Sequence, residues 1–321
     1  MPSRPTLIRA ATVPALAIAL ALSGCSSIKS GTPSTATSSD TRAVRNGGTL
    51  TVALSAEPDK LDPTLARTLV GRTVFNAICE KLYDVDAKLA VVPQLAAALP
   101  QFSADGKTVT IKVRNGVKFA DGTTLDADAV KTTLDRHMTL SGSARKTELS
   151  SVASVSVVDP STVSIAMKTP FVPLTAVLAD RAGMIMSPTA LKAEGADFGT
   201  KPVCVGPFKF SSRVAQDRIE AVKDPNYHDA AKVHLDKVVY RIIADATTRF
   251  NNLRSGDADV LDTVATTDVD ALKADTNLRL LTSDSLGYQG ITVNLGNAAG
   301  VGKPAGTLAA PYAGPLATDT I

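Results

Sequence analysis

The feature that most constrains the fold is the alternation of strand-like and helix-like segments from Gly47 onward. Alternation of this kind is typical of α/β domains, in which helices cover a sheet. Segment 47–55 is rich in β-forming residues after a glycine turn, and segment 68–82 has apolar residues near helical spacing. Strands are again expected at 237–243 and 258–264, separated by a short helix. The chain is therefore expected to fold as an α/β domain.

Two segments in the middle of the chain show the strict alternation that is typical of half-buried strands. In segment 108–114, polar residues alternate with three apolar residues that share one face, namely Val109, Ile111 and Val113. Segment 151–168 is expected to form two such strands around the turn signal Asp159-Pro160-Ser161. The sequence therefore predicts a hairpin in this region.

Segment 117–138 combines a turn with the start of an amphipathic helix. Asp121 and Gly122 form a turn signal, and Asp126 can accept hydrogen bonds from the first free amides of the next helix. The apolar stripe of this helix is expected to consist of Val130, Leu134 and Met138. His137 lies next to this stripe, so we expect it to be a partly buried structural residue.

The N-terminal part of the chain has the composition of an export signal followed by a tether. Residues 1–24 contain two arginines, no acid and an apolar stretch too short to span a bilayer, as in a secretory signal peptide. The sequence Leu22-Ser23-Gly24-Cys25 resembles the bacterial lipobox, so Cys25 is predicted to be the lipidated first residue of the mature chain. Residues 25–46 are rich in Ser and Thr and are predicted to form a disordered tether. The alternative is a chance cysteine at the end of an ordinary signal peptide.

The composition argues against several functional classes. The formal net charge is +3 for the whole chain and about +1 without Arg4 and Arg9, which gives no electrostatic case for nucleic-acid binding. A hydrophobic content of 44% without a second long apolar run predicts a buried core and no second membrane span. Trp is absent, which counts against aromatic platforms for sugars or bases.

The usual motifs for catalysis and metal binding are missing from the sequence. It contains no Gly-x-Ser-x-Gly, His-Glu-x-x-His or Gly-x-Gly-x-x-Gly pattern. His228 and His234 lie near Asp229 and Asp236, but their spacing is not that of a helical zinc site. We therefore expect no enzymatic activity, no metal and no cofactor, with an envelope hydrolase as the open alternative.

Seven segments in one register resemble the family 5 extracellular solute-binding proteins, which are the dipeptide, oligopeptide and nickel receptors of ABC importers. These segments are GGTLTVALSAEPDKLDP, VVPQLAAALP, VKFADGTTLDADAVKTTLDRHM, VGPFKF, DPNYH, ATTRFNNLRSGDADV and GYQGITVN. The resemblance implies an α/β fold like that of type II periplasmic binding proteins, with a mixed sheet in a first lobe at residues 47–296. The second lobe is expected to be largely missing, and residues 297–321 are expected to form a Gly/Pro-rich tail that leads toward it.

The candidate site follows partly from the fold and partly from the resemblance. In open α/β sheets, ligands bind beyond the carboxyl ends of strands, so the exit of the first strand is expected to border the ligand. This exit consists of Ser55, Ala56, Glu57 and Pro58. The resemblance adds as ligand-binding candidates Arg181, Gly183, Gly206, Pro207 and Tyr288. It also implies a disulfide between Cys79 and Cys204, two cysteines that could otherwise simply be buried thiols.

The resemblance implies that the chain is the substrate-binding lipoprotein of an ABC importer, anchored to the outer face of the cytoplasmic membrane. It is expected to be a monomer that captures peptides and delivers them to permease subunits. Nickel, opines, oligosaccharides and glutathione remain alternative solutes. Because one lobe supplies one wall of a cleft that closes over its ligand, this chain by itself is not expected to bind peptide measurably.

Overall fold

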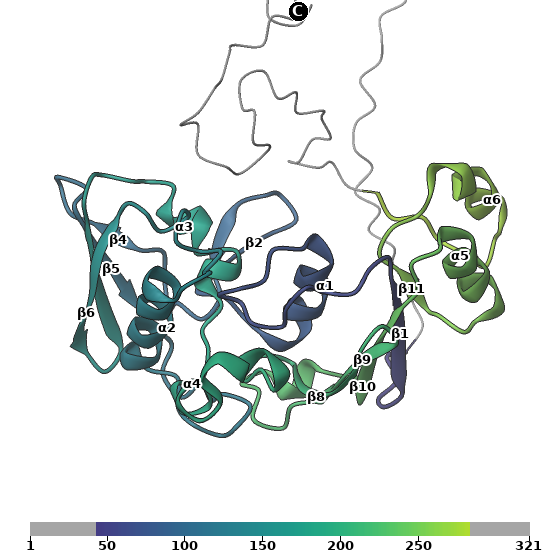
Figure 1. Ribbon diagram of the computed structural model, residues 1–321, viewed down its shortest axis with the longest axis horizontal. Helices are drawn as coiled ribbons and strands as arrows, with labels where there is room; N and C mark the ends of the chain where they lie inside the picture. The colour runs from purple at the N-terminus through teal and green to yellow at the C-terminus, as the bar shows by residue number, and fades with distance from the viewer. Residues whose placement is uncertain (1–42, 283–321) are drawn as a thin grey trace, which may run out of the picture. The chain divides into compact units, whose positions relative to one another are not determined.

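The computed structural model describes residues 43–282, which are drawn in colour in Figure 1. Over these residues the chain forms a five-stranded sheet, a four-stranded sheet and a two-stranded hairpin. Helix α1 (Leu69–Ile78) packs against the first sheet, and α2 (Ala127–Thr139) packs against the second. The structure thus confirms the α/β class that the alternating segments predict.

The five-stranded sheet joins strands from both ends of the described chain. Its order is β11 (Val260–Leu261), β1 (Thr49–Leu54), β10 (Lys237–Ile242), β9 (Arg218–Lys223) and β8 (Phe208–Val214). Strand β1 is parallel to both β10 and β11, whereas β9 is antiparallel to β10 and β8. The sheet is therefore mixed, as the family resemblance implies.

The sequence predicts a helix within segment 68–82, and helix α1 covers Leu69–Ile78 of it. The helix therefore ends before the end of the predicted segment. Val74, Phe75 and Ile78 are buried in the core of the five-stranded sheet. Leu69, which helical spacing places on the apolar stripe, is 72% exposed because it lies at the first position of the helix. Leu82 is buried, but it follows the end of the helix and packs in the core of the four-stranded sheet.

The four-stranded sheet is antiparallel throughout and is built from neighbouring parts of the chain. Its order is β4 (Gln101–Phe102), β5 (Thr108–Lys112), β7 (Thr162–Met167) and β6 (Val152–Asp159). Val109 and Ile111 are fully buried, and β6 and β7 form the expected hairpin. The alternation of apolar and polar residues thus predicts this sheet directly.

Helix α2 starts and packs as its sequence predicts. The Asp126 side chain accepts a hydrogen bond from the backbone amide of Ala129 at 2.8 Å, which caps the helix. His137 is more deeply buried than expected, with no exposed surface, and its Nδ1 lies 2.9 Å from the Thr64 hydroxyl. Burial lowers the pKa of His137 to about 3, and the charges of Arg145 and Arg136 act in the same direction.

The remaining elements are short. Strands β2 (Tyr83–Val85) and β3 (Val91–Pro93) form the small hairpin. The helices that follow are α3 (Leu174–Val177), η1 (Arg181–Gly183), α4 (Pro188–Glu194), η2 (Gly195–Thr200) and η3 (Ala230–Lys232). Beyond β10 lie α5 (Ala246–Ser255), η4 (Thr266–Asp268) and α6 (Val269–Ala274). Gly256 ends α5 in the left-handed conformation, with φ of 84°.

A disulfide joins Cys79, at the end of α1, to Cys204, with Cα atoms 4.9 Å apart. Both cysteines are buried in the core of the five-stranded sheet. The whole four-stranded sheet and the small hairpin lie in the chain between them. The disulfide therefore closes a covalent loop around the region that these two sheets occupy.

Several predicted features lie outside the described residues. They are the signal peptide at residues 1–24, the lipidation site Cys25, most of the tether at 25–46, Tyr288 and the tail at 297–321. Within residues 43–282, no helix is long and apolar enough to cross a membrane.

Candidate ligand-binding edge

The carboxyl ends of four strands meet at one edge of the five-stranded sheet. Strands β1, β10 and β11 are parallel, and β8 runs in the same direction because both it and β10 are antiparallel to β9. Four loops leave this edge, at residues 55–58, 215–217, 243–245 and 262–264. We call the surface formed by these loops the carboxyl edge. It is the place where open α/β sheets bind ligands.

Asp262 links the loop after β11 to the loop after β1. The backbone amide of Ser55 donates to Asp262 Oδ1 at 3.0 Å, and the Ser55 hydroxyl donates to Oδ2 at 2.8 Å. The amide of Asp262 in turn donates to the carbonyl of Ala53 at 3.2 Å. These three hydrogen bonds fix both the backbone and the carboxylate of Asp262 against β1.

Glu57 occupies a different electrostatic environment at the same edge. The guanidinium of Arg213 donates twice to Glu57 Oε1, at 3.0 and 2.6 Å, and the amide of Gln216 donates to Oε2 at 3.2 Å. Arg213 also donates to the carbonyl of Pro58 at 3.2 Å. The charge of Glu57 is therefore balanced by Arg213, and the pair holds the β8–β9 turn against the exit of β1.

Arg249 of α5 holds the two remaining loops of the carboxyl edge together. Its guanidinium donates to the carbonyls of Ile243 and Ala244, both at 2.8 Å, and to the carbonyl of Thr263 at 3.3 Å. Arg249 is only 4% exposed, so these contacts are shielded from water. The loops after β10 and β11 thus have defined positions relative to each other.

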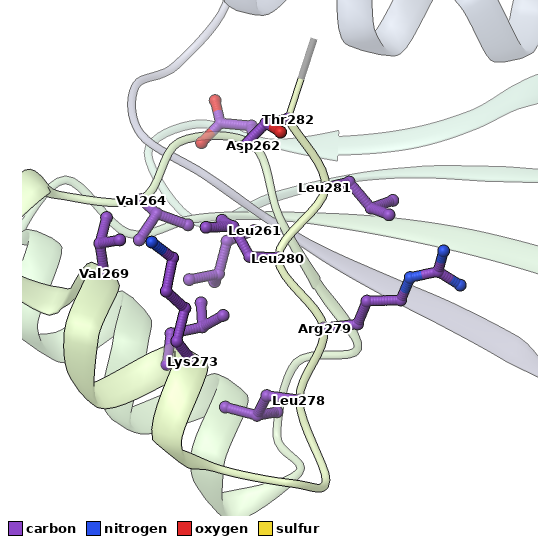
Figure 2. Close-up of a pocket in the computed structure, with 11 residues that line it drawn as sticks. Leu261, Asp262, Val264, Val269, Lys273, Leu278, Arg279, Leu280, Leu281 and Thr282 are labelled. Atoms are coloured by element: carbon purple, nitrogen blue, oxygen red, sulfur yellow. The ribbon is translucent and has the colours of Figure 1, made fainter. Parts of the chain in front are cut away.

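A pocket of about 780 Å³ adjoins the carboxyl edge beside β11 (Figure 2). Its wall comes from β11, α6 and segment 278–282. The apolar side chains of this wall are Leu261, Val264, Val269, Leu272, Leu278, Leu280 and Leu281. Asp262 lies at one end of the pocket, and Lys273 extends from α6 beside the apolar side chains. The pocket therefore combines an apolar wall with the charged side chains of Asp262, Lys273 and Arg279.

The structure places the candidates Arg181 and Gly183 in the interior. Arg181 is 7% exposed and donates to the carbonyl of Thr68 at 3.1 Å, and burial lowers its pKa. Gly183 lies so close to the backbone that an added Cβ would stand 1.8 Å from the carbonyl oxygen of Leu178. These two contacts show a packing role, and ligand binding by Arg181 and Gly183 stays a prediction.

Gly206 and Pro207 lie beside the end of α1. An added Cβ at Gly206 would stand 2.6 Å from the carbonyl carbon of Ile78. The carbonyl of Pro207 accepts a hydrogen bond from the amide of Asp224 at 3.1 Å. The two residues therefore let backbone segments approach each other closely, and their role in ligand binding likewise stays a prediction.

Sequence reasoning found the β1 side of the carboxyl edge but missed its partners. Asp262 is 207 residues from Ser55 along the chain, and Arg213 is 155 residues from Pro58. Arg249 contacts the loops after β10 and β11. No local sequence pattern therefore joins these three residues to the loop after β1. The strand predicted at 258–264 is longer than β11, which covers only Val260–Leu261. The rule for strand exits, applied to the predicted strand, therefore points beyond Asp262.

The histidines considered as metal ligands have other partners. His228 Nε2 lies 2.8 Å from Glu80 Oε2, and the Tyr227 hydroxyl donates to Glu80 Oε1 at 2.7 Å. His234 Nδ1 lies 2.8 Å from Asn46 Oδ1. Over residues 43–282, no group of three or more His, Cys, Asp or Glu side chains could hold a metal ion.

A mixed α/β sheet whose strand exits carry fixed polar groups beside a pocket is typical of small-molecule-binding domains. Comparison with known proteins narrows this class. Residues 90–310 match the family described as bacterial extracellular solute-binding proteins, family 5 middle. The glutathione-binding protein GsiB of Shigella flexneri is 31% identical over 245 residues, which are 76% of this chain and 48% of that protein.

Solved structures of related proteins agree with this assignment. AgaA from A. tumefaciens R10, in complex with agropinic acid, is 33% identical with a TM-score of 0.67, over 71% of this chain and 46% of that one. DppA from Helicobacter pylori, in complex with the peptide STSA, is 25% identical with a TM-score of 0.65, over 73% and 50%. The chain belongs to family 5 of the bacterial extracellular solute-binding proteins. It spans about half the length of the curated relatives it matches.

Proposed function

We propose that the chain contributes the first lobe of an ABC-importer receptor and that it binds peptides, or a related small solute, at the carboxyl edge. The observation that carries the proposal is the arrangement of Ser55, Glu57 and Asp262 at strand exits in a chain of this family. Contacts from Arg213 and Arg249 fix the loops in advance, which lowers the entropic cost of binding.

We infer a peptide-class solute from two of the relatives named above. GsiB is named for glutathione, which is a tripeptide, and DppA is described with the peptide STSA. AgaA is described with agropinic acid, so an opine is the leading alternative. The apolar wall of the pocket beside Asp262 supports a solute with an aliphatic portion.

We further propose that Cys25 carries lipid and holds the receptor at the outer face of the cytoplasmic membrane. The support is the lipobox-like sequence that ends at Cys25 and the Ser/Thr-rich tether that follows it. Labelled palmitate should enter the wild-type protein in a bacterial host but not the Cys25→Ser variant, which should leave the membrane fraction. Retention of the label by Cys25→Ser would contradict the anchor.

Solute binding is tested by NMR titration of the chain without its signal peptide. A pocket usually encloses about 70 to 90% of a small ligand, and residues 43–282 supply one wall, so we expect a millimolar dissociation constant that calorimetry does not detect. Glutathione, a di- to pentapeptide mixture, agropinic acid and nickel–histidine serve as probes. Saturable shifts at the amides of loops 55–58 and 262–264 would support the proposal, and no saturable shift with any probe would contradict it. Hydrolysis of a chromogenic ester, lost on substitution of one serine, would favour the hydrolase instead.

A further inference from the structure

The turn at residues 224–229, which follows β9, contacts both of the larger sheets. Its Tyr227 hydroxyl donates to Glu80, just after α1, and His228 Nε2 lies 2.8 Å from the other oxygen of the same carboxylate. The side-chain amide of Asn226 donates to the carbonyl of Ala120, in the loop before α2, at 3.4 Å. Tyr227 also packs against the core of the four-stranded sheet. The position of this turn therefore depends on contacts with both sheets.

Asp224, the first residue of this turn, has a buried carboxyl oxygen without a partner. Its Oδ1 accepts a hydrogen bond from the amide of Asn226 at 2.9 Å, whereas Oδ2 has no hydrogen-bond partner among the described residues. Asp224 has no exposed surface, and within residues 43–282 it forms no ion pair. A charged carboxylate at this position would lack both water and a paired cation, which is strongly unfavourable.

Two charged side chains lie near Asp224, and they act on its pKa in opposite directions. Burial is the largest influence and raises the pKa of Asp224, and the negative charge of Asp121, in the turn before α2, raises it further. The Asn226 amide and the charge of Lys209, on β8, lower the pKa without reversing the effect of burial. The other charged or titratable groups around this turn lie near Tyr227 and His228, and they are Glu80, Arg114, Asp229 and Lys232.

We propose that Asp224 holds a proton in the folded protein and that loss of this proton loosens the 224–229 turn from its contacts with the two sheets. Because Oδ2 is closed to solvent, a proton can bind there without any rearrangement, whereas a water molecule or a metal ion cannot. A neutral carboxyl group without a partner costs less free energy than a buried charge.

The direction of the pH dependence follows from the raised pKa of Asp224. The stability that its proton contributes is complete below the pKa of an unfolded aspartate, about 3.9, and is lost as the pH rises through the pKa in the folded protein. The turn should therefore be held most firmly in acid and loosen as the pH rises.

Asp229 offers a matched control in the same turn. Its side chain is 41% exposed and pairs with Lys232 at 2.8 Å, and the hydrogen bond from Lys232 lowers its pKa. Asp229→Asn therefore removes one charge from the turn at a position that water reaches. Asp224→Asn fixes the buried group in an uncharged form and keeps an oxygen that can accept from the Asn226 amide.

The experiment uses NMR of the chain without its signal peptide. The carboxyl carbon of Asp224 should titrate at a higher pH than that of Asp229 in the wild-type protein. Hydrogen exchange at the amides of Asn226 and Tyr227 is then compared between the wild type and Asp224→Asn at each pH. The ratio of the two rates should rise from about pH 4 by up to about tenfold per pH unit, and it should level off once Asp224 ionises in the folded protein. The rise should be the same when Asp229→Asn takes the place of the wild type.

Three outcomes would overturn the inference. Titration of Asp224 at or below the pH at which Asp229 titrates would show that the folded protein holds its charged form. A ratio of exchange rates that stays constant with pH would show that the proton does not hold the turn. Loss of the rise in Asp229→Asn would assign the effect to the net charge of the turn. The carbon titration is read in the wild-type protein, so it decides the matter even if Asp224→Asn does not fold, and no readout depends on a solute.

Discussion

The five-stranded and four-stranded sheets differ in how far along the chain their partners lie. In the five-stranded sheet, Gly48 and Asp236 are hydrogen-bonded across 188 residues, and β1 pairs with β10 in parallel. In the four-stranded sheet, β6 and β7 are joined by a tight turn. Long-range pairing costs more loop-closure entropy than a hairpin does. The sheet that carries the carboxyl edge should therefore depend more on distant contacts than the sheet beside it.

Removing the disulfide should cause the largest loss of stability and should affect the two sheets differently. The Cys79–Cys204 bond spans 125 residues, and a loop of this length is worth about 4 to 5 kcal/mol in the chain-entropy model. Replacing both cysteines by alanine should lower the free energy of unfolding by up to this amount, measured by urea denaturation. Amides of the five-stranded sheet should lose more protection from hydrogen exchange than those of β5 and β7. Equal losses in both sheets would contradict the comparison.

Gly206→Ala should have the second largest effect among the changes proposed here. The added Cβ would stand 2.6 Å from the backbone of Ile78, which cannot move without shifting α1, and we expect a loss of about 3 kcal/mol. Gly116 is the matched control, because its φ is 76° and no atom lies within 4 Å of the added Cβ. Gly116→Ala should cost only about 1 to 2 kcal/mol of backbone strain. A similar cost for the two variants in urea denaturation would disprove the close contact.

Acid should destabilise the protein through His137, which connects α2 to the loop after β1. The folded protein keeps His137 neutral down to a pKa of about 3, whereas the unfolded chain protonates it near 6.5. The contribution of this residue is therefore complete above pH 6.5 and is lost as the pH falls toward 3. The loss has a slope of about 1.4 kcal/mol per pH unit and reaches about 2 to 3 kcal/mol at pH 4.5.

The measurement compares the pH dependence of unfolding in wild-type protein and His137→Gln. Carboxylates with lowered pKa values, such as Asp59 and Asp121, affect both proteins alike. Only the difference between the two curves is assigned to His137. Parallel curves between pH 6.5 and 4 would show that the histidine is protonated in the folded state.

The smallest expected effects come from two helix caps, one beside each sheet. Asp126 caps α2 through the amide of Ala129 at 2.8 Å, and Asp245 caps α5 through the amide of Thr248 at 2.7 Å. Replacing either aspartate by alanine should cost about 1 kcal/mol. Hydrogen exchange should locate the effect of Asp245→Ala at the carboxyl edge and that of Asp126→Ala in α2. Spread of both effects through the whole chain would indicate one cooperative unit.

The same contrast explains how much of the fold could be predicted from the sequence. Val109 and Ile111 lie on one strand, and the turn at residues 159–161 joins two neighbouring strands, so local periodicity suffices for the four-stranded sheet. The parallel pairing of β1 with β10 and β11 leaves no local signal, since the partners are separated by most of the described chain. Only the family resemblance pointed to a mixed sheet.

For the candidate site, too, the sequence predicts the part that depends on a local pattern and does not predict the part that depends on strand pairing. The exit of β1 could be located because a strand followed by a loop is a local pattern, and Ser55 and Glu57 do lie at the carboxyl edge. Arg213, Arg249 and Asp262 could not, because their contacts depend on which strand lies beside which. The interior position of Gly183 is likewise a property of packing, which requires coordinates.

The disulfide also decides how the molecule responds to mechanical force. Tension applied at residues 43 and 282 passes from Cys79 to Cys204 through the sulfur–sulfur bond and bypasses the residues between them. At about 3.3 to 3.6 Å per extended residue, roughly 400 Å of contour length stays hidden until the bond is reduced. Under load the five-stranded sheet, with its carboxyl edge, can unravel, while the four-stranded sheet carries no tension. Reduction would place both sheets in series along the same line of force.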